Sequence, residues 1–138
     1  MFNYKNINCV DRVENWQEAI KLSAKPLLES ESIVSAYIDK MIENITKLGF
    51  YVVLDEYVAM PHARPEDGVM KTSISFLKVN EGVYFGEDII YLIFTLSAKD
   101  SNEHINILQK LMEIFQDEEL KSALINAKDI DSLIKLLK

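Results

Sequence analysis

The hydrophobic pattern of this chain switches from a helical period to a strand period and back again. Before Gly49, apolar residues recur every three or four positions in two stretches, 13–27 and 34–48. After Gly49 come three shorter stretches rich in β-branched and aromatic residues, at 50–54, 72–79 and 89–96. Helical spacing then returns and continues to the last residues. Helices on both sides of a run of strands predict a layered α/β domain with a mixed β-sheet flanked by helices on both sides.

Single residues suggest where the helices begin and end. Asp11 is suited to cap the first helix, and Pro26 is expected to end or kink it. The second helix is expected after residues 30–32 and is stopped by Gly49. The third helix is expected after residues 100–102, followed by two short helices at 118–125 and 130–137.

The strand signals differ in strength. Residues 50–54 predict a buried strand, and residues 89–96 are apolar on both faces, which indicates a central position in a sheet. The segment 80–88 contains two glycines and several acidic residues, so it is predicted to be a surface loop between two strands.

Composition narrows the class of protein. The 138 residues are 49% hydrophobic with only four glycines and three prolines, so we expect one folded domain over residues 1–138. The net charge of −7 argues against a nucleic-acid partner and weakly favours a basic protein partner. The longest apolar stretch, 89–98, is too short to insert into a membrane. A single cysteine and an N-terminus without an apolar core lead us to expect a cytoplasmic protein.

His62 lies between Pro61 and Pro65, just beyond an apolar segment. Each proline fixes its own φ and biases the preceding residue away from helix, so the backbone around His62 is stiff. A rigidly placed histidine suits catalysis, where small errors of position are costly. The alternative is an ordinary loop histidine with prolines that mark turns, and residue types alone do not decide between the two.

His104 is the only other histidine and falls in the first turn of the predicted third helix. Unpaired N–H groups and the positive end of the helix dipole attract anions there and favour a neutral imidazole that donates one hydrogen bond. The alternative is a surface histidine near a helix cap. Both histidines follow predicted strands, and ligand sites of open α/β sheets lie at the carboxyl ends of strands.

The sequence gives little support for a zinc site, a serine hydrolase site or a nucleotide site. Asp55, Glu66 or Asp67 could complete a zinc site with the two histidines, but no short histidine spacing is present. The chain lacks the Gly-x-Ser-x-Gly elbow of serine hydrolases and the glycine-rich loops that hold nucleotides. Cys9 is interpreted as a structural thiol. We therefore expect neither a metal nor a cofactor.

The segment Ala59-Met60-Pro61-His62-Ala63 resembles the active-site signature of the mannitol/fructose class of enzyme IIA of the bacterial sugar phosphotransferase system (PTS). Its continuation, residues 64–69, is most similar to the ascorbate-type branch. The resemblance covers nearly the whole chain and includes residues 16–20, 25–28, 41–44, His104 and 117–120. One departure is Asp55-Glu56, where the family often carries a glycine-containing turn.

The resemblance implies the enzyme IIA fold and a protein-histidine phosphotransferase activity. His62 would accept a phosphoryl group from phospho-HPr and pass it to a cysteine of enzyme IIB, which serves the membrane enzyme IIC in sugar uptake. His104 would match the second active-site histidine and stabilise charge. Arg64 is our candidate for a fixed positive charge. The resemblance favours ascorbate as the sugar.

Two other functions stay open at this point. A regulatory enzyme IIA-like domain would carry the same histidine, with phosphorylation acting as a signal rather than a transport step. A binding module that keeps the fold without turnover would accept no phosphate. Transfer to a cognate enzyme IIB would distinguish the first of these, and labelling by phospho-HPr the second.

Overall fold

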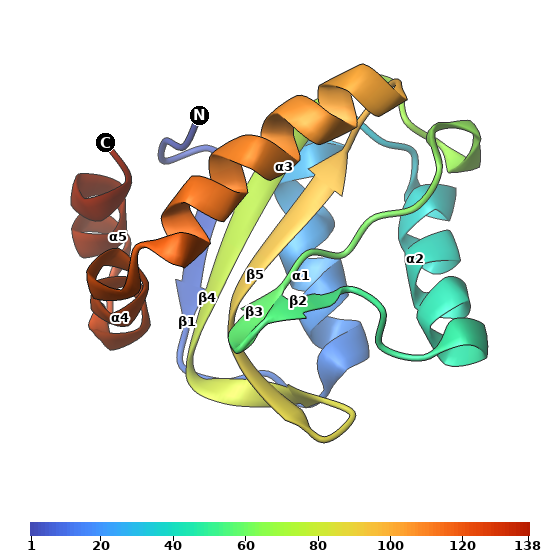
Figure 1. The fold of residues 1–138 in the computed structure, drawn as a ribbon. Coiled ribbons are helices and arrows are strands. Elements are labelled where there is room, and N and C mark those ends of the chain that lie inside the picture. The colour runs from blue at the N-terminus through green and yellow to red at the C-terminus, as the bar shows by residue number, and fades with distance from the viewer.

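A five-stranded mixed sheet forms the centre of the molecule in the order β1-β4-β5-β3-β2. A computed structural model describes all residues, 1–138 (Figure 1). β1 is parallel to β4, β4 antiparallel to β5, β5 parallel to β3, and β3 antiparallel to β2. The mixed sheet predicted from the sequence is thus confirmed. The strands are β1 (Ile7–Val10), β2 (Val53–Asp55), β3 (Tyr57–Ala59), β4 (Ser73–Phe85) and β5 (Asp88–Ser97).

Helices cover both faces of this sheet. α1 and α2 pack on one face, and α3, α4 and α5 pack on the other (Figure 1). Successive residues of a strand point to opposite faces, so Leu77 joins the core under α1 and α2 while Phe76 joins the core under α3 to α5. The helices are α1 (Trp16–Glu29), α2 (Ser35–Leu48), the 3-10 turn η1 (Pro65–Asp67), α3 (Ser101–Gln116), α4 (Glu118–Asn126) and α5 (Ile130–Leu137).

The central strand and the end of the second helix are confirmed as predicted from the sequence. β5 is the middle strand, as its apolar character on both faces indicated. Gly49 ends α2 with φ +90°, a left-handed backbone that glycine adopts without a side-chain clash. The third helix lies where it was expected but begins slightly earlier, at Ser101, because Asp100 caps it by accepting a hydrogen bond from the backbone N–H of Glu103. No helix combines the length and the apolar character needed to cross a bilayer.

The start of α1 was predicted wrongly, and Pro26 does not end the helix, which was one of the two effects expected of it. Asn15 caps α1, because Asp11 lies just past β1 and accepts a hydrogen bond from Asn80 instead. Pro26 lies inside α1, which continues to Glu29. Burial of Leu27 in the core stabilises this last turn despite the backbone hydrogen bond that a proline removes.

The strand predictions need three corrections. Residues 50–54 do not form a buried strand; only Val53–Asp55 pairs, as an exposed edge. Residues 80–88 are not a loop, because β4 runs on to Phe85 and pairs with β5 from Asp88. A register shift between Lys78 and Val83 absorbs the extra residues. β1 and β3 were not predicted, since strands of four and three residues carry too little local pattern.

Candidate active site

The fold brings the two histidines together. His62 follows β3, His104 follows β5, and these strands are parallel neighbours, so their carboxyl ends lie at the same edge of the sheet. The centroids of the two imidazole rings are 5.2 Å apart, with the ring planes inclined by 56°. Two side chains separated by 42 positions in the chain therefore face each other.

Both rings line a cavity of about 370 Å³. It is bounded by the His62 loop on one side and by the first turn of α3 on the other. Its walls combine both imidazoles with a tyrosine, small side chains and the helix cap. The lining residues are Tyr37, His62, Ala63, Pro65, Leu96, Ala98, Asp100, Ser101, His104 and Ile105.

The imidazole of His62 is held in one tautomer. Its Nδ1 lies 2.8 Å from the carbonyl oxygen of Met60. A carbonyl oxygen only accepts hydrogen bonds, so Nδ1 carries the proton and donates it. In the neutral ring the lone pair is then on Nε2. The geometry provides a nucleophilic nitrogen of defined identity.

Burial lowers the pKa of His62 below its ordinary value, because the charged imidazolium loses water. The hydrogen bond to Met60 acts in the opposite direction and is the weaker effect, while the neighbouring His104 lowers the pKa further. His62 is therefore neutral at pH 7. A neutral imidazole can attack an electrophile directly.

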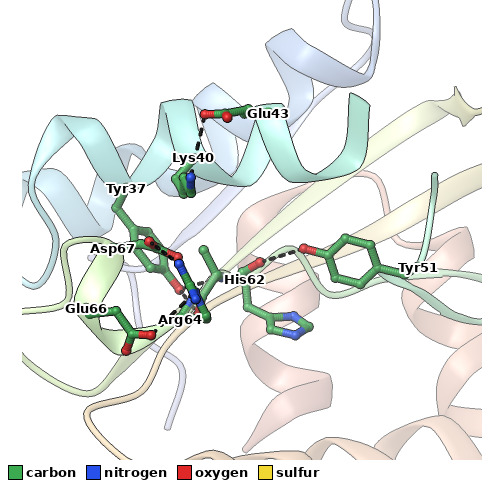
Figure 2. A network of polar contacts seen from close by, with 9 residues as sticks. Tyr37, Lys40, Glu43, Tyr51, His62, Arg64, Glu66 and Asp67 are labelled. Carbon is green, nitrogen blue, oxygen red and sulfur yellow. Dashed lines mark hydrogen bonds and ion pairs between the residues drawn. The ribbon is translucent and has the colours of Figure 1, made fainter. Parts of the chain in front are cut away.

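Hydrogen bonds hold the backbone on both sides of His62. The N–H of Leu96 donates to the Pro61 carbonyl at 3.0 Å, and the N–H of Ala63 donates to the Tyr37 hydroxyl at 2.9 Å. The Tyr51 hydroxyl donates to the His62 carbonyl at 3.3 Å (Figure 2). These contacts reinforce the stiffness that the flanking prolines predicted.

Tyr37 and Tyr51 are site residues that the sequence analysis missed. Tyr37 was interpreted as part of the apolar stripe of α2, and Tyr51 as part of a strand. A signal for Tyr37 was present, because a buried tyrosine hydroxyl needs a hydrogen-bond partner. Which backbone supplies that partner is visible only in the fold.

Arg64 turns away from the cavity toward its own acidic neighbours. Its guanidinium lies 3.4 Å from carboxylate oxygens of Glu66 and Asp67, and its side chain is 67% exposed (Figure 2). The backbone N–H of Arg64 also donates to Asp67 at 3.0 Å. Arg64 is not among the residues that line the cavity. The structure thus brings together His62 and His104 but leaves Arg64 at the rim.

His104 lies at the N-terminal end of α3. Its backbone N–H bonds to the Asp100 carbonyl at 3.1 Å, as the first turn requires. The first N–H groups of a helix have no partner within the helix, and the positive end of its dipole favours anions. No group of three or more His, Cys, Asp and Glu side chains is arranged to hold a metal ion. The arrangement can receive an anionic group bonded to His62.

Comparison with known proteins identifies the family of this chain. Residues 1–138 match the family described as "Phosphoenolpyruvate-dependent sugar phosphotransferase system, EIIA 2". The mannitol-specific cryptic phosphotransferase enzyme IIA component of Escherichia coli (strain K12) is 36% identical over 138 residues, covering 99% of this chain and 94% of that protein. The ascorbate-specific PTS system EIIA component of the same strain is 30% identical over 119 residues, covering 83% of this chain and 77% of that protein.

Solved structures agree with this fold. The solution structure of the mannitol-specific cryptic enzyme IIA from Escherichia coli has a TM-score of 0.91 at 36% identity, covering 99% of this chain and 94% of that one. The mannitol enzyme IIA in its complex with phosphorylated mannitol enzyme IIB, also from Escherichia coli, has a TM-score of 0.85 at 27% identity, covering 99% of this chain and 96% of that one. The chain belongs to the enzyme IIA family of the phosphoenolpyruvate-dependent sugar phosphotransferase system, whose members are transferases in sugar transport.

Proposed function

We propose that His62 accepts a phosphoryl group from phospho-HPr and passes it to a cysteine of an enzyme IIB during sugar uptake. The observation that carries this proposal is the hydrogen bond from His62 Nδ1 to the Met60 carbonyl at 2.8 Å. It leaves Nε2 as the nitrogen with a free lone pair, next to a cavity shared with His104.

The first transfer exchanges one phosphorus–nitrogen bond for another. The Nε2 lone pair attacks phosphorus, and the bond from phosphorus to the histidine nitrogen of phospho-HPr breaks with its electron pair staying on that nitrogen. The proton on His62 Nδ1 stays in place, hydrogen-bonded to Met60. That bond stabilises the positive charge of the phosphorylated ring.

The second transfer uses the same retained proton. A cysteine thiolate of enzyme IIB attacks phosphorus, a phosphorus–sulfur bond forms, and the bond to Nε2 breaks. Because Nδ1 is already protonated, His62 leaves as a neutral imidazole and regains its starting tautomer. Neither transfer, from HPr or to enzyme IIB, requires a proton to move on this protein.

His104 is proposed to stabilise the phosphoryl oxygens. It faces His62 with ring centroids 5.2 Å apart, from the anion-favouring end of α3. Arg64 is proposed to have a smaller role in stabilising the phosphoryl oxygens. Its guanidinium would have to leave Glu66 and Asp67 to reach the phosphoryl group, so we expect it to contribute less than His104.

Support for the partners comes from a relative. An enzyme IIA that is 27% identical has been solved with phosphorylated enzyme IIB. We extend that partnership to this chain, with HPr as donor and a membrane enzyme IIC served indirectly, and we place the protein in the cytoplasm with them. The named relatives include mannitol-type and ascorbate-type components at 36% and 30% identity, so either sugar class is a candidate.

The proposal is tested by labelling with enzyme I, HPr and phosphoenolpyruvate, followed by mass spectrometry of the acid-labile phosphate. We expect one phosphoryl group on His62, complete loss of label in His62→Ala, and retained label in His104→Ala. The labelled protein should then phosphorylate a cysteine of its cognate enzyme IIB. Label on His104 alone, or undiminished label in His62→Ala, contradicts the proposal.

A further inference from the structure

The side chain of Tyr37 is fully buried, and its hydroxyl bonds only with backbone groups at the site. It accepts the N–H of Ala63 at 2.9 Å and donates to the Leu96 carbonyl at 2.8 Å, with the Ala63 carbonyl farther away at 3.2 Å. Burial raises the pKa of Tyr37 to about 12, so the hydroxyl keeps the proton that it donates.

These bonds tie both neighbours of His62 to one residue of β5. The N–H of Leu96 donates directly to the Pro61 carbonyl at 3.0 Å. The carbonyl of Leu96 holds Ala63 through the Tyr37 hydroxyl, which reaches the loop from α2 (Figure 2). The residue before His62, Pro61, and the residue after it, Ala63, are therefore both held in place by hydrogen bonds.

The orientation of the His62 imidazole depends on the backbone at both Pro61 and Ala63. His62 Nδ1 bonds to the carbonyl of Met60, two residues earlier, so the bond forms only at one set of backbone angles for Pro61 and His62. The backbone angles of Pro61 are set by its own ring and by the hydrogen bond that its carbonyl accepts from the N–H of Leu96. On the other side, no side chain except Tyr37 bonds to Ala63. The Tyr51 bond is longer and partly exposed, so water can replace it.

We infer that Tyr37 is a positioning residue, whose hydroxyl fixes the backbone after His62 and thereby holds His62 Nδ1–H against the Met60 carbonyl. Its effect on phosphoryl transfer rests on the proposed function. Its effect on the imidazole tautomer does not, because that tautomer exists in the unphosphorylated protein.

The first measurement is ¹⁵N NMR of His62 in the unphosphorylated wild type and in Tyr37→Phe at pH 7.5. Phenylalanine keeps the ring in the core and removes only the hydroxyl. We expect the pure Nδ1–H tautomer in the wild type and a mixture of both tautomers in Tyr37→Phe. The matched control is Ser23→Ala, which removes another buried hydroxyl, one whose hydrogen bonds go to Thr95 at 2.8 Å and to the Ile93 carbonyl at 3.5 Å. It should keep the pure tautomer.

The second measurement is the rate of labelling at saturating phospho-HPr. A displaced nucleophile is costly, so we expect Tyr37→Phe to lose about 10- to 100-fold in kcat with little change in KM. Ser23→Ala should stay within about two-fold of the wild type, since it affects stability only. A loss confined to KM would indicate a docking effect and overturn the inference.

Either a pure Nδ1–H tautomer or a wild-type rate in Tyr37→Phe refutes the inference. Should that variant not fold, hydrogen exchange in the wild type decides: the Ala63 amide must be strongly protected, and a freely exchanging amide refutes the inference. If the wild type takes no label on His62, the proposed function fails while the tautomer result still stands on its own.

Discussion

Lys78 carries a positive charge into the interior of the sheet, and its removal should change how stability depends on pH. Its side chain, on β4, is 0% exposed. The ammonium group donates to the Asn80 side chain at 3.1 Å and to the Ala127 carbonyl, and neither partner is negatively charged. Burial, with a smaller contribution from Lys128, lowers the pKa of Lys78 from 10.5 to about 8.

The size and sign of the effect follow from that shift. A pKa lower in the folded state than in the unfolded state means that the unfolded chain binds the proton more tightly, so stability rises with pH. Below pH 8 both states are protonated and folding carries the full cost, ~3 kcal/mol for this shift. The cost disappears as pH rises from about 8 to 10.5. Between pH 7 and 10 the wild type should recover about 2 to 3 kcal/mol.

The assay is urea unfolding of wild type and Lys78→Met at pH 7, 8, 9 and 10. Methionine leaves the Ala127 carbonyl unpaired, which costs about 1–3 kcal/mol at every pH and leaves the slope unaffected. The difference in unfolding free energy, wild type minus variant, should therefore grow by about 2 to 3 kcal/mol across this range. Groups that titrate alike in both proteins cancel.

An exposed lysine of α3, Lys110, supplies the control. Lys110→Met should show no such pH-dependent difference from the wild type. A difference for Lys78→Met that stays flat with pH, or that shrinks as pH rises, would refute the reasoning that Lys78 is a desolvated cation in the folded state.

Two further predictions concern the histidines. His104→Ala should take label from phospho-HPr yet transfer it to enzyme IIB about 10²–10³-fold more slowly, because one donor to the phosphoryl oxygens is lost. His104→Gln should recover part of this transfer rate. Arg64→Ala should reduce the transfer rate less than His104→Ala does. Rapid-quench transfer measures this, and a wild-type rate for His104→Ala would leave His104 without a role. The labelling rate of the wild type should fall with a midpoint below pH 6.5, the ordinary pKa of histidine, because burial lowers the pKa of His62. A pH profile centred above 6.5 would contradict this.

Local pattern was enough for the long helices and the central strand. The stripe of α2 and the stop at Gly49 are properties of residues within a few turns of one another, so periodicity reveals them. β5 could be placed in the middle of the sheet because apolar residues on both faces require cover on both faces.

Pairing between distant segments was not predictable in the same way. β1 is four residues long and exists because β4 lies beside it, and residues 80–85 form strand because β5 folds back onto them. Short strands gain little from their own composition and are stabilised by the partner. Pro26 likewise stays in α1 because burial of its surroundings outweighs a local preference.

Two properties of the site follow from neighbouring residues alone: the backbone of His62 is stiff, and His104 lies in the first turn of a helix. Proline ring closure and helix-end amides act within a few residues. Three other properties depend on the folded chain: the two rings lie 5.2 Å apart, Tyr37 bonds to Ala63, and Arg64 pairs with its own acidic neighbours. Those contacts depend on which strands are neighbours and which way they run. Chain order does not contain that information in any short window, because the order β1-β4-β5-β3-β2 results from packing the whole core.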